Sequence, residues 1–330
     1  MKKKATVICW ISTALAALAN GVLPTDQVHC GGSYRYGRAV WHCHKRSGHG
    51  TVAMRSGIAK SCNVYFYTMA RRVGAQAVAD MARTLGLDHK FDIPMPVQRA
   101  GDIPDPAWKR KRFDKDWTVA DTLNMSIGQG YVVVNPLQLA VMTARIATGR
   151  MVEPRMLTGR APKAFAPLPI PPEYLDVVRG GMDDVVNGPG GTARGSMLRV
   201  PGVAMGGKTG TAQVRRISGS ARGGANVPWK FRDHALFIGF APVDNPRYAI
   251  SVVVEHGIGG SRAAAPIARD VLTWIYDRPA AEKQLAGVLE ARERARRAAE
   301  EAAARAAAEA AAARAAAAAP VPAPAAGGAP

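Results

Sequence analysis

The stretch Gly206-Gly207-Lys208-Thr209-Gly210-Thr211-Ala212-Gln213-Val214 decides how the rest of the chain is interpreted. Two glycines precede the lysine and small or β-branched residues follow it, which predicts a β-strand with little side-chain bulk. Such a strand packs poorly by itself, so another backbone or a ligand should lie close to it. Its ammonium group and two threonine hydroxyls could hold an extended peptide that ends in a carboxylate, by strand addition. An ordinary junction between a strand and a turn is the alternative.

Two further strands are predicted downstream, over residues 235–240 and 248–254, and the Pro242–Pro246 segment between them indicates a hairpin. A closing helix is expected over residues 263–276. Other predicted helices cover residues 51–73, 75–85, 135–148 and 171–186. Helices around consecutive strands predict the α+β class, here an antiparallel sheet flanked by helices.

Charge limits the classes of partner. The chain has 330 residues, 48% of them hydrophobic, and a formal net charge of +19. Residues 281–330 hold seven basic and six acidic residues, which leaves +18 on the rest of the chain. Nucleic acid, an anionic membrane and a cell-wall polymer all suit such a surface. The basic run Trp108–Phe113 suggests either a phosphate site or a solvated charge run, and because no nucleic-acid module accompanies it, we expect no nucleic-acid partner.

The first residues allow three interpretations. Lys2-Lys3-Lys4 and the apolar run Ala5–Leu23 have the pattern of a secretory signal, with Ala17-Leu18-Ala19 as a cleavage site. The same run is just long enough to span a bilayer. The third interpretation is a buried core helix that ends at Asn20-Gly21.

The segment from residue 24 to 50 predicts an irregular, glycine-rich loop, which is unusual in a compact domain unless something clamps it. Cys30, Cys43 and Cys62 with His49 would make a tetrahedral Cys₃His set suited to structural Zn²⁺. A disulfide or free thiols are the alternatives, and no Cys-x-x-Cys pair occurs in the chain.

Ser61-Cys62-Asn63 interrupts the predicted helix over residues 51–73. Serine and asparagine prefer helix caps to helix interiors, so the local pattern favours an N-cap for the next helix. The alternative is that these small polar groups point into a cleft.

The tail from residue 279 changes to Ala, Glu and Arg, with Glu placed four residues before Arg. This spacing predicts an exposed helix without an apolar stripe. The final Ala/Pro/Gly stretch is predicted to be disordered.

The Lys-Thr-Gly-Thr sequence, with Ser-x-Asn upstream, resembles the active-site set of penicillin-binding proteins and serine β-lactamases. Further segments are similar to the elongation-specific transpeptidases of the penicillin-binding protein 2 type, in the same order. The resemblance covers roughly residues 13–278, so we predict a transpeptidase domain over residues 1–278 and a tail over 279–330. The similar segments are Ser61–Tyr67, Ser126–Tyr131, Asn135–Ala140, His49–Val52 and Asp244–Pro246.

The resemblance implies serine acylation by the D-Ala-D-Ala end of a peptidoglycan stem peptide, followed by transfer to an amine, with an oxyanion hole. It also implies that β-lactams and proteins of the elongation complex are partners, and that the site is at the periplasmic face of the inner membrane. By position, Ser61 would relay protons and Asn63 would orient the peptide amide. Lys208 and the hydroxyls of Thr209 and Thr211 would hold the terminal carboxylate. Gly210 would let the substrate backbone approach, and the Thr211 N–H would be one donor to the oxyanion.

Some members of this family carry zinc beside the Ser-x-Asn motif, with ligands at the positions of Cys30, Cys43, His49 and Cys62. The resemblance therefore favours zinc over the disulfide and the free thiols. Cys62 would then tie the metal directly to the catalytic motif and hold its neighbours in place.

One family element is missing. The family places Ser-x-x-Lys just before the helix that resembles Thr13–Gly21, where this chain reads Thr6–Ser12, and no Ser-x-x-Lys occurs anywhere in it. We expect the dimerisation domain and membrane anchor that precede this pair in the family to be missing as well, and we expect a truncated or frame-disrupted copy whose own turnover is nil or very low. A zinc-containing module that binds wall peptides or elongation-complex proteins without catalysis is the alternative.

Overall fold

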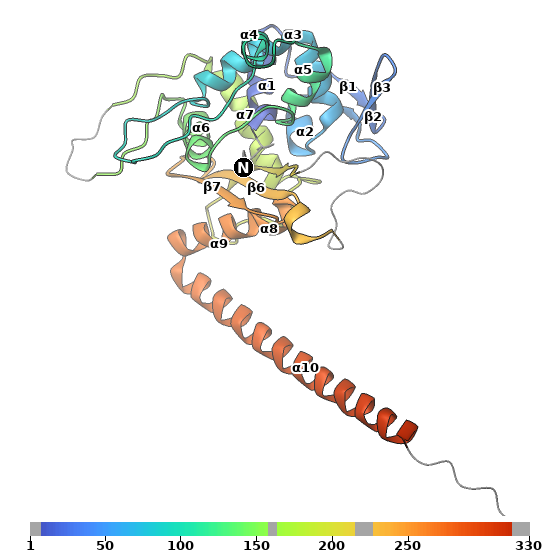
Figure 1. The fold of residues 1–330 in the computed structure, drawn as a ribbon. Helices are drawn as coiled ribbons and strands as arrows, with labels where there is room; N and C mark the ends of the chain where they lie inside the picture. The colour runs from blue at the N-terminus through green and yellow to red at the C-terminus, as the bar shows by residue number, and fades with distance from the viewer. Residues whose placement is uncertain (1–7, 158–163, 215–226, 319–330) are drawn as a thin grey trace, which may run out of the picture. The chain divides into compact units, whose positions relative to one another are not determined.

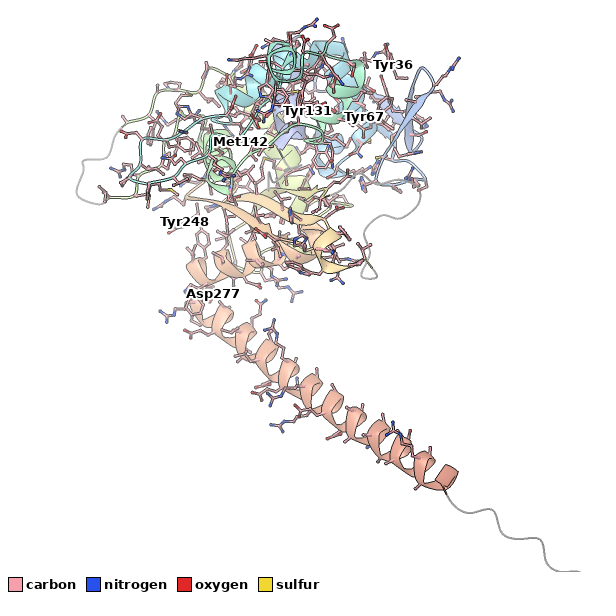
Figure 2. The ribbon with its side chains drawn as sticks, in the orientation of Figure 1. Tyr36, Tyr67, Tyr131, Met142, Tyr248 and Asp277 are labelled. Carbon is pink, nitrogen blue, oxygen red and sulfur yellow. The ribbon has the colours of Figure 1, made fainter. Side chains whose placement is uncertain are left out.

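The computed structural model describes residues 8–157, 164–214 and 227–318 (Figure 1). The chain divides into two compact units, with the boundary between Tyr276 and Asp277 (Figure 2). The second unit contains the exposed helix α10 (Arg278–Ala318), in which Glu290 pairs with Arg294 at 3.7 Å. The prediction that this helix has no apolar stripe is wrong for its first turns, since exposed apolar side chains share one face there. These residues are Leu285, Val288 and Leu289. The predicted disorder of the end of the chain falls on residues 319–330, outside the described residues.

Strands β5 (Gly206–Ala212), β6 (His234–Ala241) and β7 (Tyr248–Val254) form an antiparallel sheet in that order. Strand β5 is an edge strand of this sheet, and Lys208 lies opposite Ile238 in the register. Strand β6 is buried along its whole length. The predicted hairpin between β6 and β7 is confirmed, and so is the α+β class.

Helices cover both faces of the sheet (Figure 1). Helices α6 (Pro136–Thr148) and α7 (Pro172–Val186) lie on one side, and α8 (Gly260–Ala263) and α9 (Ala265–Tyr276) lie on the other. The predicted bounds of α6 are confirmed, because Asn135 accepts a hydrogen bond from the Gln138 N–H and Gly149 ends the helix at φ 66°.

Helix α1 (Ile8–Ala19) confirms the core-helix interpretation of the first residues. Its side chains from Cys9 to Leu18 are buried, as expected for a helix that is apolar on all sides. It packs against α3 (Asn63–Thr84), α7 and α5 (Val119–Ser126). None of the described helices combines the length and hydropathy needed to cross a bilayer.

The predicted loop over residues 24–50 is largely short strands. Strand β1 (Val28–Cys30) pairs with β4 (Gly50–Val52), and β2 (Ser33–Tyr36) pairs with β3 (Ala39–His42). These strands have only three or four residues each, too few to give a clear alternating pattern.

The helices around Ser61 also differ from prediction. Helix α2 (Met54–Ala59) is short, and the two helices expected on either side of Gly74 meet there as α3, with non-helical backbone at that glycine (φ 87°). Two helices were not predicted, α5 and α4 (Pro106–Phe113). Helix α4 contains the basic run, whose Lys109 is buried and donates to Asp121 at 2.6 Å. The remaining short elements are the 3₁₀ turns Arg194–Ser196 and Trp229–Phe231.

Candidate active site

Ser61 lies in the turn that ends α2 and begins α3. Its N–H donates to the Ile58 carbonyl, and the Cys62 N–H donates to the Gly57 carbonyl, a Schellman arrangement. The left-handed position of this motif usually holds glycine, but here Ser61 occupies it at φ 51°. A serine in this conformation costs about 1 kcal/mol, which is a mark of sites where function outweighs local stability.

Lys208 on β5 reaches this serine from the sheet. Its Nζ donates to Ser61 Oγ and, at 3.1 Å, to the Thr209 carbonyl. The Lys208 side chain is fully buried, and no carboxylate of the described residues forms an ion pair with it. Burial lowers the pKa of Lys208 well below its usual value, because desolvation disfavours the ammonium form.

A third element completes a ring of polar groups. Thr192 Oγ1 lies 3.0 Å from Thr209 Oγ1 and 3.5 Å from Ser61 Oγ, so it links the edge strand to the turn. Sequence analysis did not identify Thr192. The available signal was the pair of glycines before it, since a Cβ on Gly191 would lie 2.2 Å from the Asp184 carbonyl oxygen and only glycine fits.

Asn63 lies two residues after Ser61, at the start of α3. Its Nδ2 donates to the His42 carbonyl at 3.2 Å, and its side chain is buried. Cys62 is the N-cap residue of α3, but no side chain caps the helix there. The N-cap interpretation of the three residues is therefore wrong for their side chains, and Ser61 meets Lys208 instead.

The remaining predicted residues lie along the same strand. Thr211 is half-buried, two residues beyond Thr209 on β5, and Gly210 lies between them. Gly260 of α8 approaches so closely that a Cβ there would be 2.6 Å from the Gly210 carbonyl oxygen. The structure thus places all six predicted site residues on β5 and on the turn before α3, with Ser61 and Lys208 in direct contact. Their individual roles remain predictions.

Trp10 lies in the stretch Thr6–Ser12, where the resemblance expects Ser-x-x-Lys. Lys208 Nζ lies 3.7 Å from the centroid of its ring, a cation–π contact. The Trp10 Nε1–H is buried and has no hydrogen-bond partner among the described residues. An aromatic ring therefore covers the ammonium at this end of the site.

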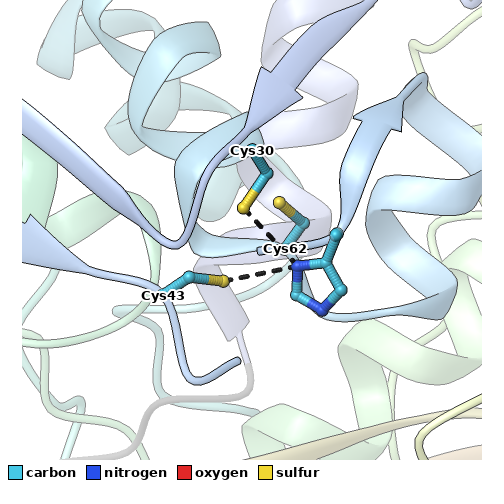
Figure 3. A group of neighbouring side chains, drawn as sticks. Cys30, Cys43 and Cys62 are labelled. Atoms are coloured by element: carbon cyan, nitrogen blue, oxygen red, sulfur yellow. Dashed lines mark hydrogen bonds between the residues drawn. The ribbon is translucent and has the colours of Figure 1, made fainter. Parts of the chain in front are cut away.

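Four potential metal ligands converge on the other side of the turn (Figure 3). Cys30 ends β1, Cys43 follows β3, His49 precedes β4, and Cys62 begins α3; their ligand atoms all lie within 4.8 Å of one another. His49 Nδ1 lies 3.6 Å from Cys30 Sγ and 3.5 Å from Cys43 Sγ. A tetrahedral zinc ion with ordinary bond lengths needs about 3.5 Å between a sulfur and a nitrogen ligand, so these residues fit Zn²⁺.

The chemical state of the cysteines and of His49 bears on whether they can bind a cation. All four cysteines of the chain are free, so the disulfide alternative is wrong. The hydrogen bond from Cys62 lowers the pKa of Cys43 well below its usual value, whereas the hydrogen bond with Cys43 and burial raise the pKa of Cys62. Burial lowers the pKa of His49 and so favours the neutral imidazole that binds metal.

The chain has clear relatives. Residues 11–273 match the family model described as "Penicillin binding protein transpeptidase domain". The peptidoglycan D,D-transpeptidase MrdA of Acinetobacter baumannii is 36% identical over 71% of this chain and 36% of its own length. The protein of that name from Haemophilus influenzae is 31% identical over 72% of this chain and 39% of its own length. The chain therefore spans a little over a third of these curated relatives.

Solved structures agree with this assignment. The crystal structure of Pseudomonas aeruginosa PBP2 in complex with WCK 5153 has a TM-score of 0.72 and 34% identity, over 84% of this chain and 59% of that one. PBP2 of Helicobacter pylori, in its complex with MreC, has a TM-score of 0.72 and 29% identity, over 81% of this chain and 48% of that one. With the polar ring and the order of its motifs, these matches show that the chain belongs to the penicillin-binding protein transpeptidase family, in the branch of penicillin-binding protein 2.

Proposed function

We propose that the cleft at β5 recognises the D-Ala-D-Ala end of a peptidoglycan stem peptide, in the service of cell-wall cross-linking. The observation that carries this proposal is the fully buried Lys208 ammonium, which has no carboxylate partner among the described residues. A buried cation is costly unless it is paired, and a substrate carboxylate would supply the missing partner. Thr209 and Thr211 would add hydroxyl donors, and Asn63 would orient the peptide amide.

We further propose that the 330-residue chain by itself does not form an acyl-enzyme. Acylation needs an activated serine, and the chain contains no Ser-x-x-Lys. Ser61 contacts Lys208, but in this family's pattern it stands in the Ser-x-Asn motif, where it relays protons. The remaining polar ring would bind peptide and β-lactam non-covalently.

Incubation with fluorescent penicillin, followed by denaturing electrophoresis, tests this proposal. We expect no labelled band at any time point, together with saturable quenching of the free probe under native conditions. A labelled band that survives denaturation would contradict the absence of acylation, and absence of native binding would contradict recognition itself.

A structural zinc ion is the proposed occupant of the Cys30, Cys43, His49 and Cys62 set, with Cys62 joining it to the catalytic motif. Bound there, zinc would cross-link the short strands to the start of α3. The set is complete whereas the Ser-x-x-Lys pair is not, and this favours a second candidate function, a zinc-containing module that binds wall peptides without turnover. Stoichiometric zinc with peptide binding and no D-alanine release would identify that module.

The proposed partners follow the relatives. PBP2 of Helicobacter pylori has been solved with MreC, so we propose that elongation-complex proteins bind this chain as well. We propose β-lactams as ligands because the family is defined by penicillin binding. The proposed location is the periplasmic face of the inner membrane.

A further inference from the structure

A long segment beside the cleft contains no acidic residue. Between Asp26 and Asp80 the sequence has eight Lys/Arg and neither Asp nor Glu. A surface segment of this length usually carries both basic and acidic residues. Because this one carries only basic residues, it concentrates positive potential. It contains the β2–β3 hairpin, the loop after it, α2 and most of α3.

Seven of these eight cations fall into two groups, and the eighth, Lys60, is half-buried just after α2. Arg55 pairs with Asp184 at 2.5 Å, Arg72 pairs with Asp26 at 2.7 Å, and Arg71 lies over the Tyr36 ring. Four others are exposed and form no ion pair with the described residues; we call them the hairpin cations. They are Arg35, Arg38, Lys45 and Arg46.

The backbone that carries the hairpin cations is held firmly. The Cys43 N–H donates to the Gly32 carbonyl at 2.9 Å. Gly48, at φ 80°, packs so tightly that a Cβ there would lie 2.1 Å from the Cys30 carbonyl oxygen. The hairpin rests on α3, where the Tyr34 and Tyr67 rings are 5.8 Å apart. The backbone positions of the cations are therefore fixed, so binding an anion requires ordering of their side chains but not of the chain that carries them.

The open end of the hairpin lies beside Asn63. His42, the last residue of β3, accepts the Asn63 side-chain hydrogen bond through its carbonyl. From there β3 runs to the turn at Arg38 over four residues, about 13 Å. A stem peptide of five residues spans about 16 Å when extended. A peptide that engages Asn63 is thus long enough to place its other carboxylates beside the hairpin cations.

From this placement we propose that the hairpin cations form a subsite for the internal carboxylates of a peptidoglycan stem peptide. The inference rests on the proposed recognition of D-Ala-D-Ala peptides and extends that site along the hairpin. An anionic membrane is a weaker fit, because Tyr34 and Trp41 are half-buried and Arg71 lies over the exposed Tyr36, which leaves Val40 as the main apolar side chain that the hairpin could insert.

Binding of two synthetic pentapeptides to the full chain tests the proposal. Both end in D-Ala-D-Ala with a free terminal carboxylate; one has free internal carboxylates and the other has them amidated. Exposed charge pairs are individually weak, so we expect the first peptide to bind about tenfold tighter at low salt. Added salt should remove the difference because these contacts are exposed.

The matching variant neutralises the hairpin cations: Arg35→Gln, Arg38→Gln, Lys45→Gln and Arg46→Gln. It should bind both peptides with the affinity that the wild type has for the amidated one. The control makes the same charge change on α10: Arg292→Gln, Arg294→Gln, Arg305→Gln and Arg314→Gln. It should keep the tenfold preference. If the first variant does not fold, Arg35→Glu with Arg38→Glu should weaken the preference, and Arg35→Lys with Arg38→Lys should retain it.

The outcomes separate this inference from the proposed function. If the amidated peptide does not bind the wild type, recognition of D-Ala-D-Ala is wrong. If both peptides bind equally and the neutral variant changes nothing, the subsite is wrong and recognition stands. If the hairpin cations instead govern binding to vesicles of anionic phospholipid, with no preference between the peptides, the surface is a membrane contact and the proposal is overturned.

Discussion

The two sides of the Ser61–Asn63 turn differ in their electrostatics: one buries a cation, and the other gathers groups that bind one. On the cleft side, Ser61 meets a buried ammonium that has no carboxylate partner among the described residues. On the other side, Cys62 completes a compact set of thiols and an imidazole that suits a cation. An unpaired buried ammonium is costly until a ligand pairs with it, whereas a metal bound to the thiol set would stabilise the fold. Under the proposed function, that metal would anchor the turn that carries the strained serine.

Loss of the metal ligands should produce the largest effect. Cys43→Ala would remove one ligand of the set, and we expect loss of bound zinc and a drop in unfolding free energy of more than about 4 kcal/mol. Zinc content and thermal unfolding measure this. The control is Cys9→Ala, because Cys9 is buried in α1 with its pKa raised to about 12 by burial, and lies outside the set. Full stability in Cys43→Ala would show that the thiol side anchors nothing.

Replacement of the buried cation should move stability and binding in opposite directions. Lys208→Met removes a desolvated charge, so we expect a gain of about 1 kcal/mol in unfolding free energy. The same change removes the charge that faces the substrate carboxylate, and peptide affinity should fall about 30-fold, or about 2 kcal/mol. Denaturant unfolding and peptide titration measure the two effects. A variant that is less stable and binds equally well would reverse the proposed role of Lys208.

The pH dependence sharpens the same contrast. Burial places the folded-state pKa of Lys208 below its unfolded value. Between these two values the unfolded chain binds more protons, so this group makes stability rise with pH. Carboxylate binding needs the protonated form, so affinity should fall as pH rises through the folded-state pKa. The unfolding free energy and the peptide affinity of wild type and of Lys208→Met should be measured from pH 6 to pH 10. The difference between the two proteins isolates the contribution of Lys208 to each pH dependence. If both proteins show the same pH dependence, the account is contradicted.

The smallest predicted effect concerns the strained serine. Ser61→Ala keeps the left-handed backbone and removes the hydroxyl, and should cost about 1 kcal/mol of stability. Ser61→Gly also removes the hydroxyl but relieves the backbone, and should be about 1 kcal/mol more stable than the alanine variant. Both should weaken peptide binding equally. Identical stability of the two variants would mean that the turn stores no strain.

Much of the fold could be predicted because local signals agreed with the tertiary structure. Helix α6 has its Asn135 cap and its Gly149 stop, and the β6–β7 hairpin has two long runs of β-forming residues on either side of Pro242–Pro246. The strands between residues 28 and 52 were missed because each is too short to show a period, and tertiary contacts hold them. Helices α4 and α5 were missed because charges and polar residues obscured their apolar faces.

The candidate site was only partly predictable for a similar reason. The strand around Lys208 and the Ser61–Asn63 turn were visible as motifs, but their contact depends on the packing of α2, α3 and β5. Thr192 gave no motif of its own, since its place in the polar ring is set by the turn after α7. The direction of the Ser61 side chain could not be read from cap preferences, because serine there occupies a position that usually holds glycine.

Titration of the zinc-loaded chain with a D-Ala-D-Ala peptide and with its C-terminal amide tests the central claim most directly. The amide keeps every contact except the terminal negative charge that Lys208 would pair with. We predict that the free acid binds at least tenfold tighter than the amide, and that Lys208→Met abolishes this preference. Equal affinity of the wild-type chain for acid and amide would contradict the assignment of this cleft as a carboxylate-binding site.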